Sequence, residues 1–351
     1  VLQLHALRGG GRLIPDSVTP LRRRVVGVAF WILPVGAAFL ALLFGRYGGG
    51  AGAALRSLFF PGPSDETLRS LILLVRAPRT LAALLVGANL AAAGAALQGL
   101  FRNPLVDARI LGVSSGAAFG ACLAILSTGS ALAVQSGAFA FALLAVAVVL
   151  ATGWRLGATP LALLLVGIAV SAFFDASLGL VKYVADPLSK LPAITYWLLG
   201  GLHATRWSNL SPLLILSAIG LVSLWLVRWR LNVLTLNDEE AVALGVRVRS
   251  LRVFVVVAAS LLVATSVAQA GMIGWIGLVI PHVARAWVGS DHVRLIPASA
   301  ALGAAVLVVL DTAARTALPG EIPLGILTGL LGVPAFLFLL IGYVRSRGGA
   351  R

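Results

Sequence analysis

Ten apolar stretches recur along the chain, separated by shorter polar stretches. Each is near the ~20 residues of helix that a bilayer core requires. Backbone polar groups inside lipid must be satisfied within their own segment, which favours helices. The pattern therefore predicts an all-α polytopic membrane protein with about ten transmembrane helices. The expected spans are residues 25–44, 80–101, 110–127, 132–153, 160–181, 211–228, 253–270, 272–289, 295–314 and 323–343.

One polar stretch, residues 228–252, interrupts this pattern. It holds five arginines and the consecutive acids Asp238 to Glu240, and it has no apolar run long enough to span. A short helix is predicted there, because Asn237 or Asp238 can cap its start, acids favour the positive end of its dipole and Gly245 can end it. Such a helix offers a handle to a partner outside the membrane; the plainer interpretation is a solvated connecting loop.

Lysine and arginine are distributed unequally between the two sides that ten spans define. The side with both termini collects 18 of them and the opposite side 9. Because cytoplasmic loops are enriched in these residues, both termini are expected in the cytoplasm. The expected domains are an N-terminal tail at 1–24, a transmembrane domain at 25–345 with a cytoplasmic loop at 229–252, and a C-terminal tail at 346–351.

The amino-acid composition is that of a protein whose surface mostly faces lipid rather than water. The 351 residues are 60% hydrophobic and 11% charged, with a mean hydropathy of +1.01, whereas a soluble domain carries about a quarter charged residues. The net charge of +15 would suit nucleic acid, but the basic residues lie at the ends of apolar runs, so no nucleic-acid partner is expected. The single cysteine, Cys122, excludes an intrachain disulfide and a cysteine metal cluster.

No catalytic or nucleotide-binding set is visible. The four histidines lack metal-ligand spacing, no GxxxxGK[ST] motif occurs, and neither Lys182 nor Lys190 follows a glycine-rich loop. The chain is therefore not expected to be an enzyme or to bind a cofactor or metal. If ATP powers it, the ATP and Mg²⁺ belong to another chain.

Two acids lie within the expected spans, Asp175 and Asp311. Intramembrane acids are functional candidates by default. Arg315 shares a helix face with Asp311 and predicts a local ion pair. Asp175 has no partner within a turn, so we expect it to pair across helices or to line a cavity.

Three polar breaks flank the early spans. In Arg76-Ala-Pro-Arg79, the proline suits a first helical turn. The two guanidiniums at the outer mouth can then bind carboxylates of a docking protein or simply reach the interface by snorkelling. On the cytoplasmic side, residues 102–107 and 157–160 cannot continue a helix. They are candidate gates, with ordinary turns as the alternative.

The chain also carries a weak internal repeat. The segment AAAGAALQGLFRNPL…LGVSSGAAFGA resembles AQAGMIGWIGLVIPH…LIPASAALGA. Both place a glycine-rich helix before a polar-proline break and a small-residue helix. Repeats of this kind are common in transporters and frame a pathway between the halves.

Several longer motifs resemble the FecCD family, the permease subunits of type II ABC importers for iron–siderophore complexes, heme and cobalamin. In the first half the resemblance lies in RAPRTLAALLVGANLAAAGAALQGLFRNPLVDARILGVSSGAAFGA. In the second half it lies in LNDEEAVALGV, GMIGWIGLVIPHVARAWVGSDHVRLIPASAALGA and LDTAARTALPGEIPLGILTGLLGVPAF. These motifs follow the family's order from about residue 25 to 345.

The resemblance implies a homodimer of ten-helix subunits in the bacterial inner membrane, with two ABC ATPase subunits that hold ATP and Mg²⁺ and one periplasmic binding protein. It assigns the docking of that protein to Arg76, Arg79 and Arg315. It assigns cytoplasmic gates to Asn103 and Leu105 and to Ala158 and Thr159. It assigns ATPase coupling to Asp238, Glu239, Glu240, Ala241, Leu244 and Gly245.

Two departures from the family pattern bear on the cargo. Gly271-Met-Ile-Gly-Trp275 stands where the family often has Gly-Pro-Ile-Gly-Phe, and Gly332-Val-Pro-Ala-Phe336 where it often has a Gly-Ala-Pro-Phe-Phe-like run. An iron chelate, siderophore or heme, is the expected cargo because such systems make up most of the family; cobalamin and oxyanions such as molybdate stay open. An ion-coupled secondary transporter and a non-transporting membrane scaffold are the alternatives of other classes.

Overall fold

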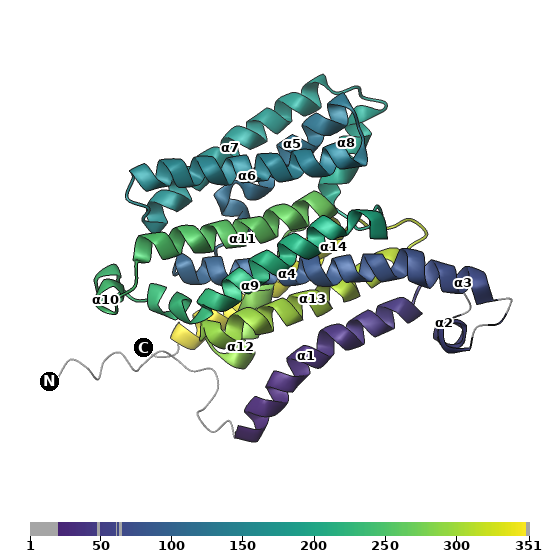
Figure 1. Ribbon diagram of the computed structural model, residues 1–351, viewed down its shortest axis with the longest axis horizontal. Coiled ribbons are helices and arrows are strands. Elements are labelled where there is room, and N and C mark those ends of the chain that lie inside the picture. Colours follow the sequence, from purple (N-terminus) through teal and green to yellow (C-terminus); the bar gives the residue numbers. More distant parts are fainter. Residues whose placement is uncertain (1–19, 48–49, 61, 63–64, 349–351) are drawn as a thin grey trace.

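The structure, a computed structural model, describes residues 20–348 except 48–49, 61 and 63–64 (Figure 1). Every regular element among these residues is a helix. The long helices are α1 (Pro20–Leu43), α4 (Ala77–Leu100), α5 (Val113–Ser127), α6 (Ala131–Arg155), α7 (Pro160–Val184), α9 (Ser211–Leu234), α11 (Val248–Ala270), α12 (Ile276–Val288), α13 (His292–Thr316) and α14 (Leu324–Gly348). The short ones are α2 (Ala51–Phe59), α3 (Glu66–Leu71), η3 (Ile72–Arg76), η4 (Ala108–Leu111), α8 (Lys190–Leu199), η5 (Trp207–Asn209) and α10 (Asp238–Ala243).

The ten long helices correspond one to one with the ten predicted spans. Within the described part of the chain, seven have the length and apolar character to cross a membrane, while α5, α12 and the apolar part of α1 are shorter. Of the predicted tails, residues 1–19 and 349–351 lie outside the described residues. The helices nevertheless begin and end beyond the expected domain limits, at Pro20 and Gly348.

The second span begins earlier than predicted. It continues backwards through η3 and α3 to Glu66, a helical stretch of 35 residues. Pro78 lies inside this stretch, where its ring and missing N–H would ordinarily break the helix. The wider π-helical turn η3 ends two residues before Pro78, and such a turn accommodates a disturbed hydrogen-bond ladder.

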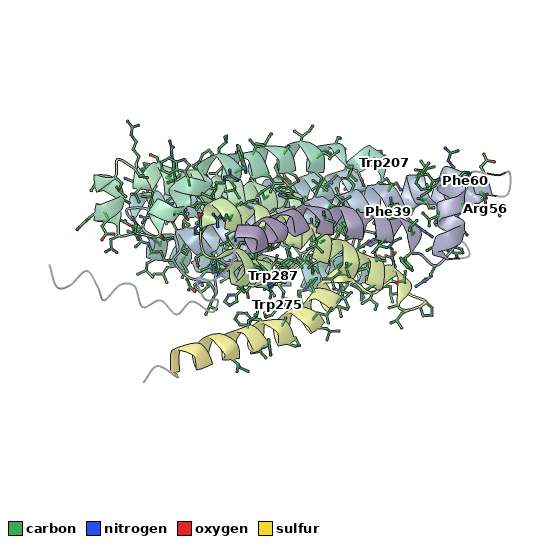
Figure 2. The ribbon with its side chains drawn as sticks, turned by 90° about the horizontal axis from the view of Figure 1, so that it is seen from below. Phe39, Arg56, Phe60, Trp207, Trp275 and Trp287 are labelled. Carbon is green, nitrogen blue, oxygen red and sulfur yellow. The ribbon has the colours of Figure 1, made fainter. Side chains whose placement is uncertain are left out.

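The helices form layers (Figure 1). α5, α6, α7 and α8 make one layer, α4, α9, α11 and α13 lie beneath it, and α1 runs along the opposite side. α4 and α11 are the most buried of the long helices and form the centre of the bundle. α14 leaves the body of the bundle and runs along its flank (Figure 2), with little of its surface buried.

Glycine brings two groups of helices into close backbone contact. A Cβ atom on Gly94 of α4 would collide with the backbone of Gly277 in α12, and one on Gly87 with the backbone of Gly303 in α13. In the other layer, a Cβ on Gly120 of α5 would collide with Gly137 of α6. α4, α12 and α13 therefore form one tightly joined block, and α5 and α6 a second.

The two ends of the bundle differ. One end, here called the α10 end, carries α10 and the turns after α4, α6 and α12 (Figure 1). The other, the α2 end, carries α2, α3 and α8 and the turn between α13 and α14.

Candidate functional site

A buried charge cluster lies at the α2 end. Arg79 donates two hydrogen bonds to one oxygen of Asp311, at 2.9 and 2.8 Å, and a third to the other oxygen at 3.0 Å. It also donates to Glu321 at 2.5 Å. The side chains of Arg79 and Asp311 are only 8% and 3% exposed, so this is a desolvated ion pair with bidentate geometry.

The local pair predicted for Asp311 is the minor part of this cluster. Arg315 approaches Asp311 only to 3.8 Å and donates instead to the backbone carbonyl of Ala41. The main partner, Arg79, lies 232 residues away in sequence. Helix periodicity identified the shared face of Asp311 and Arg315, but no local pattern points to a partner on another helix.

Arg76 is held by backbone rather than by carboxylates. It donates to the carbonyls of Leu42 at 2.9 Å and Tyr47 at 2.7 Å, and it is almost fully buried. All three predicted docking arginines therefore turn into the protein in this conformation. For Arg76 and Arg79 this differs from the exposed helix mouth that the sequence pattern indicated. Docking through them stays a prediction.

His203 lies near this charge cluster, close to Arg79 and Glu321. Its ring lies 4.9 Å from that of Tyr196. Partial burial lowers the pKa of His203, and the charge of Arg79 lowers it further, while Glu321 opposes them. The imidazole is therefore neutral at pH 7 and leaves the charge balance to the arginines and carboxylates.

At the α10 end, one carboxylate joins three elements. Oδ1 of Asp238 accepts hydrogen bonds from Arg252 of α11 at 2.5 Å and from Arg102, in the turn after α4, at 2.9 Å. Arg102 also donates to the carbonyl of Leu234 at the end of α9, at 2.9 Å. The hydrogen bond from Arg252, together with the nearby charges, lowers the pKa of Asp238. Asp238 thus binds α10 to the neighbouring turn and helix instead of capping its own helix.

The rest of α10 presents a mixed surface. Glu239 and Glu240 are exposed, and so are the apolar side chains of Val242 and Leu244, at 61% and 63%. Ala241 is fully buried against the bundle. Gly245 takes a left-handed φ of 78°, which ends the helix as predicted.

The predicted gate residues occupy two turns at the same end. The side chain of Asn103 accepts from the N–H of Leu105 at 2.9 Å, and Leu105 is 47% exposed. Thr159 accepts from the N–H of Ala162 at 3.2 Å and so caps α7, while Ala158 is buried with a left-handed φ of 52°. The structure explains these residues as turn formers, and their gating role stays a prediction.

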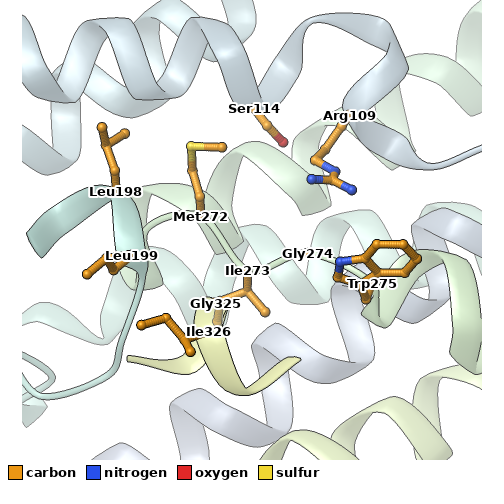
Figure 3. Close-up of a pocket in the computed structure, with 10 residues that line it drawn as sticks. All are labelled: Arg109, Ser114, Leu198, Leu199, Met272, Ile273, Gly274, Trp275, Gly325 and Ile326. Carbon is orange, nitrogen blue, oxygen red and sulfur yellow. The ribbon is translucent and has the colours of Figure 1, made fainter. Parts of the chain in front are cut away.

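A cavity of about 250 Å³ lies inside the bundle, where several chain breaks meet (Figure 3). Its wall includes Arg109 in η4, Ser114 at the start of α5, and Met272 and Trp275 between α11 and α12. The ends of α8 and α14 complete the wall. Trp275 takes a left-handed φ of 70°, which is uncommon for a bulky residue. The count of 18 basic residues on the predicted cytoplasmic side includes Arg109, and the sequence pattern did not reveal this cavity.

Comparison with known proteins decides the family. The model of the FecCD transport family matches residues 32–342. The chain belongs to the FecCD transport family. It is therefore a polytopic permease of the type II ABC importer class.

Relatives of this FecCD protein carry different cargo names. The "Molybdate import system permease protein MolB" of Haemophilus influenzae is 41% identical over 81% of this chain and 84% of that protein. The "Probable iron chelatin transport system permease protein" of Helicobacter pylori is 42% identical over 84% and 88%. Permeases named for cobalamin and hemin import, from Halobacterium salinarum and Yersinia pestis, match at 42% and 41% identity.

A solved structure confirms the fold of this FecCD permease. A metal-chelate type ABC transporter in an inward-facing conformation superposes with a TM-score of 0.83 at 38% sequence identity. The match covers 91% of this chain and 99% of the other.

Proposed function

We propose that this chain is the membrane subunit of a binding-protein-dependent importer that moves a metal chelate, with an iron–siderophore complex or heme as the first candidate. Cobalamin and molybdate are the alternatives that the names of its relatives support. The assembly would contain two copies of this chain, two ABC ATPase subunits that hold ATP and Mg²⁺, and one periplasmic binding protein. The observation that carries the proposal is the family match over nearly the whole chain.

The surface of α10 supports an ATPase partner at that end. Two exposed glutamates beside exposed Val242 and Leu244 form a small acidic and apolar face, which suits a cleft on another protein. Through Asp238, movement of α10 reaches both Arg102, next to the candidate gate, and α11. ATP-driven closure of the partner would in this way move the turn that carries Asn103 and Leu105.

The α2 end suits the binding protein. Four of its arginines are exposed in the structure: Arg46, Arg56, Arg69 and Arg206. Arg76, Arg79 and Arg315 lie below them, held by internal oxygens. We propose that a carboxylate of the docking protein replaces Glu321 as the partner of Arg79, because Glu321 is the more exposed of the two acids that hold it.

The exposed surfaces of α7 and α14 support a homodimer. Asp175 is exposed in the middle of α7, and a charge facing lipid at that depth is costly. α14 exposes Leu330 and Phe338, at 67% and 79%. A second copy packed against α7 and α14 would cover the apolar face of α14. Asp175 would then lie at the interface between the two copies, facing a water-filled pathway.

An ion-coupled secondary transporter is less well supported. Asp311, one of its two candidate ion sites, is already paired with Arg79 and sealed from water. That arrangement serves structure rather than the reversible binding of a cation.

The decisive experiment is uptake in proteoliposomes that contain this chain, its ATPase and its binding protein. A ferric siderophore, heme, cobalamin and molybdate are offered in turn. We expect one cargo to accumulate, and accumulation to stop without ATP or without the binding protein. Uptake that follows a proton or sodium gradient without ATP would overturn the proposal.

A further inference from the structure

Arg109 lies well inside the bundle rather than at its end. Its neighbours Ile110 and Leu111 pack against Gly167, seven residues into α7. At 1.5 Å of rise per residue this is about 10 Å from the first residue of that helix. Asp107, two residues before Arg109, lies near Gly277, which itself packs against Leu90 in the middle of α4. The chain after α4 therefore turns back into the bundle.

The side chain of Arg109 is nevertheless 47% exposed. An arginine that faced lipid at such a depth would be strongly unfavourable, and intramembrane charges face protein or water-filled cavities. Arg109 lines the cavity of about 250 Å³ described above. Its exposed part therefore opens into this cavity rather than toward lipid.

The guanidinium has hydrogen-bonding capacity to spare. Its Nε donates to Asp107 at 2.8 Å, and that carboxylate is 15% exposed and does not line the cavity. The terminal amino groups have no hydrogen-bond partner among the residues that the structure describes, and they lie beside Gly274 on the cavity wall (Figure 3). These free donors form a planar fork whose geometry suits bidentate contact with carboxylate-like oxygens.

Arg109 is the one charged residue among the residues that line this cavity. Trp275 and Met272 are apolar or polarisable, and Ser114 adds a hydroxyl. The larger hollow between α6 and α7, about 640 Å³, has no charged residue on its wall and is mostly apolar, with Thr152 and Ser177 as its polar residues. The smaller cavity is also below the ~300–1,000 Å³ of clefts that enclose a drug-sized ligand, so it suits a small anion or one group of a larger chelate.

We infer that Arg109 and the cavity around it recognise an anionic oxygen group of the cargo, such as a carboxylate, a catecholate or an oxyanion. This inference rests on the proposed function, because it treats the cavity as part of the wall of the import pathway. Arg109 is then a specificity residue that favours anionic over neutral cargo. Gly274 lies directly beside it, since a Cβ there would make ordinary van der Waals contact with a terminal guanidinium nitrogen at 3.4 Å.

The first test needs no cargo and no ATPase. In the purified permease, quenching of Trp275 fluorescence is obtained as the difference between the wild type and Trp275→Phe. Iodide, an anion, and acrylamide, a neutral molecule, are the quenchers. We expect Arg109→Gln to reduce the iodide quenching constant of Trp275 by roughly twofold or more at low salt, because it removes a nearby positive charge. Equal iodide constants, with or without Arg109, would overturn the inference.

The second test measures uptake in the reconstituted importer. Molybdate and a ferric catecholate serve as anionic cargoes, and a neutral ferric hydroxamate and cyanocobalamin as neutral ones. We expect Arg109→Gln to lower the uptake of the anionic cargo about tenfold, the effect of losing one charge-assisted hydrogen bond. Arg109→Lys should retain most of the uptake, and Arg294→Gln, an exposed arginine at the α10 end, serves as the matched control.

The outcomes separate the inference from the function on which it rests. A wild type that imports only a neutral cargo, with ATP and with no effect of Arg109→Gln, overturns the anion site and leaves the importer intact. Uptake that needs no ATP overturns the proposed function, and the iodide measurement then still decides whether the cavity prefers anions.

Discussion

At Gly94 the backbones of α4 and α12 come closer than any other residue would permit. A Cβ there would collide with three backbone atoms of Gly277. No side-chain rotation relieves such a collision, so the helices would have to separate. The sequence showed glycine-rich helices but not which glycines touch, because that depends on the register between helices far apart in the chain.

We therefore predict that Gly94→Ala destabilises the permease by about 1–3 kcal/mol through overpacking. The measurement is the thermal unfolding midpoint in detergent. Gly36→Ala in α1 is the control, since nothing lies within 4 Å of its added Cβ. Equal midpoints for the two variants would contradict the contact.

The Arg79–Asp311 pair permits a second prediction at this scale. Asp311→Asn removes the more buried of the two counter-charges of the Arg79 guanidinium and should destabilise the protein by about 3–5 kcal/mol. The double variant Arg79→Gln with Asp311→Asn should be more stable than the sum of the single effects implies. Thermal unfolding of the four proteins measures this coupling, and strictly additive effects would argue against the pair.

Among the elements, α10 has the most direct link between structure and mechanism. Its existence and its end at Gly245 were predictable from the acidic run and the glycine, whereas neither Asn237 nor Asp238 caps its start with a side-chain hydrogen bond, contrary to the prediction. Its attachment was not, because Arg102 and Arg252 reach Asp238 from segments that a linear pattern does not bring together. The early start of the second span was missed for a related reason, since Pro78 signals a helix start locally and η3 accommodates it within a longer helix.

We predict that Asp238→Asn weakens coupling between ATP hydrolysis and uptake. The variant should still bind its ATPase through the exposed face of α10, but less of the hydrolysis should lead to transport. The ratio of cargo moved to ATP hydrolysed in proteoliposomes measures this effect. Ala243→Ser, on the same helix and exposed, is a matched control, and an unchanged ratio in Asp238→Asn would exclude this link.

The pH dependence of this link follows from the lowered pKa of Asp238. Its pairing with Arg252 and Arg102 is complete above the ordinary carboxyl value of 3.8 and is lost as the pH falls through the lower value in the folded protein. Because Asp238 stays ionised, its contribution to the coupling between ATP hydrolysis and uptake should not change with pH between about 5 and 8. Titration of its carboxyl carbon by NMR would check this, and a midpoint above the ordinary value would contradict the pairing.

At the scale of the whole molecule, the membrane explains why so much was predictable. Lipid requires long, continuous apolar helices, so the ten long helices could be predicted from hydropathy, and seven of them in the described part of the chain have the length and apolar character to span. What hydropathy does not encode is depth within the bundle. Arg109 follows a span and resembles a loop residue, yet the chain folds back and carries it inward.

The orientation of the permease is the prediction that belongs to this scale. Glu239→Cys at the α10 end and Ser208→Cys at the α2 end are both exposed positions, and the native Cys122 is buried. In intact spheroplasts, a membrane-impermeant maleimide should label position 208 and should label position 239 only after permeabilisation. The reverse pattern would place both termini outside.

The glycine contacts also bear on how such a molecule can deform. Two helix backbones in direct contact resist sliding past each other. We therefore expect α4, α12 and α13 to move as one rigid block and α5 and α6 as a second. A movement of α10 will then be taken up at the boundary between the two blocks, along α11, rather than by bending either block. The motion of lowest energy in the permease should be a shear of one block relative to the other, with α11 at the boundary.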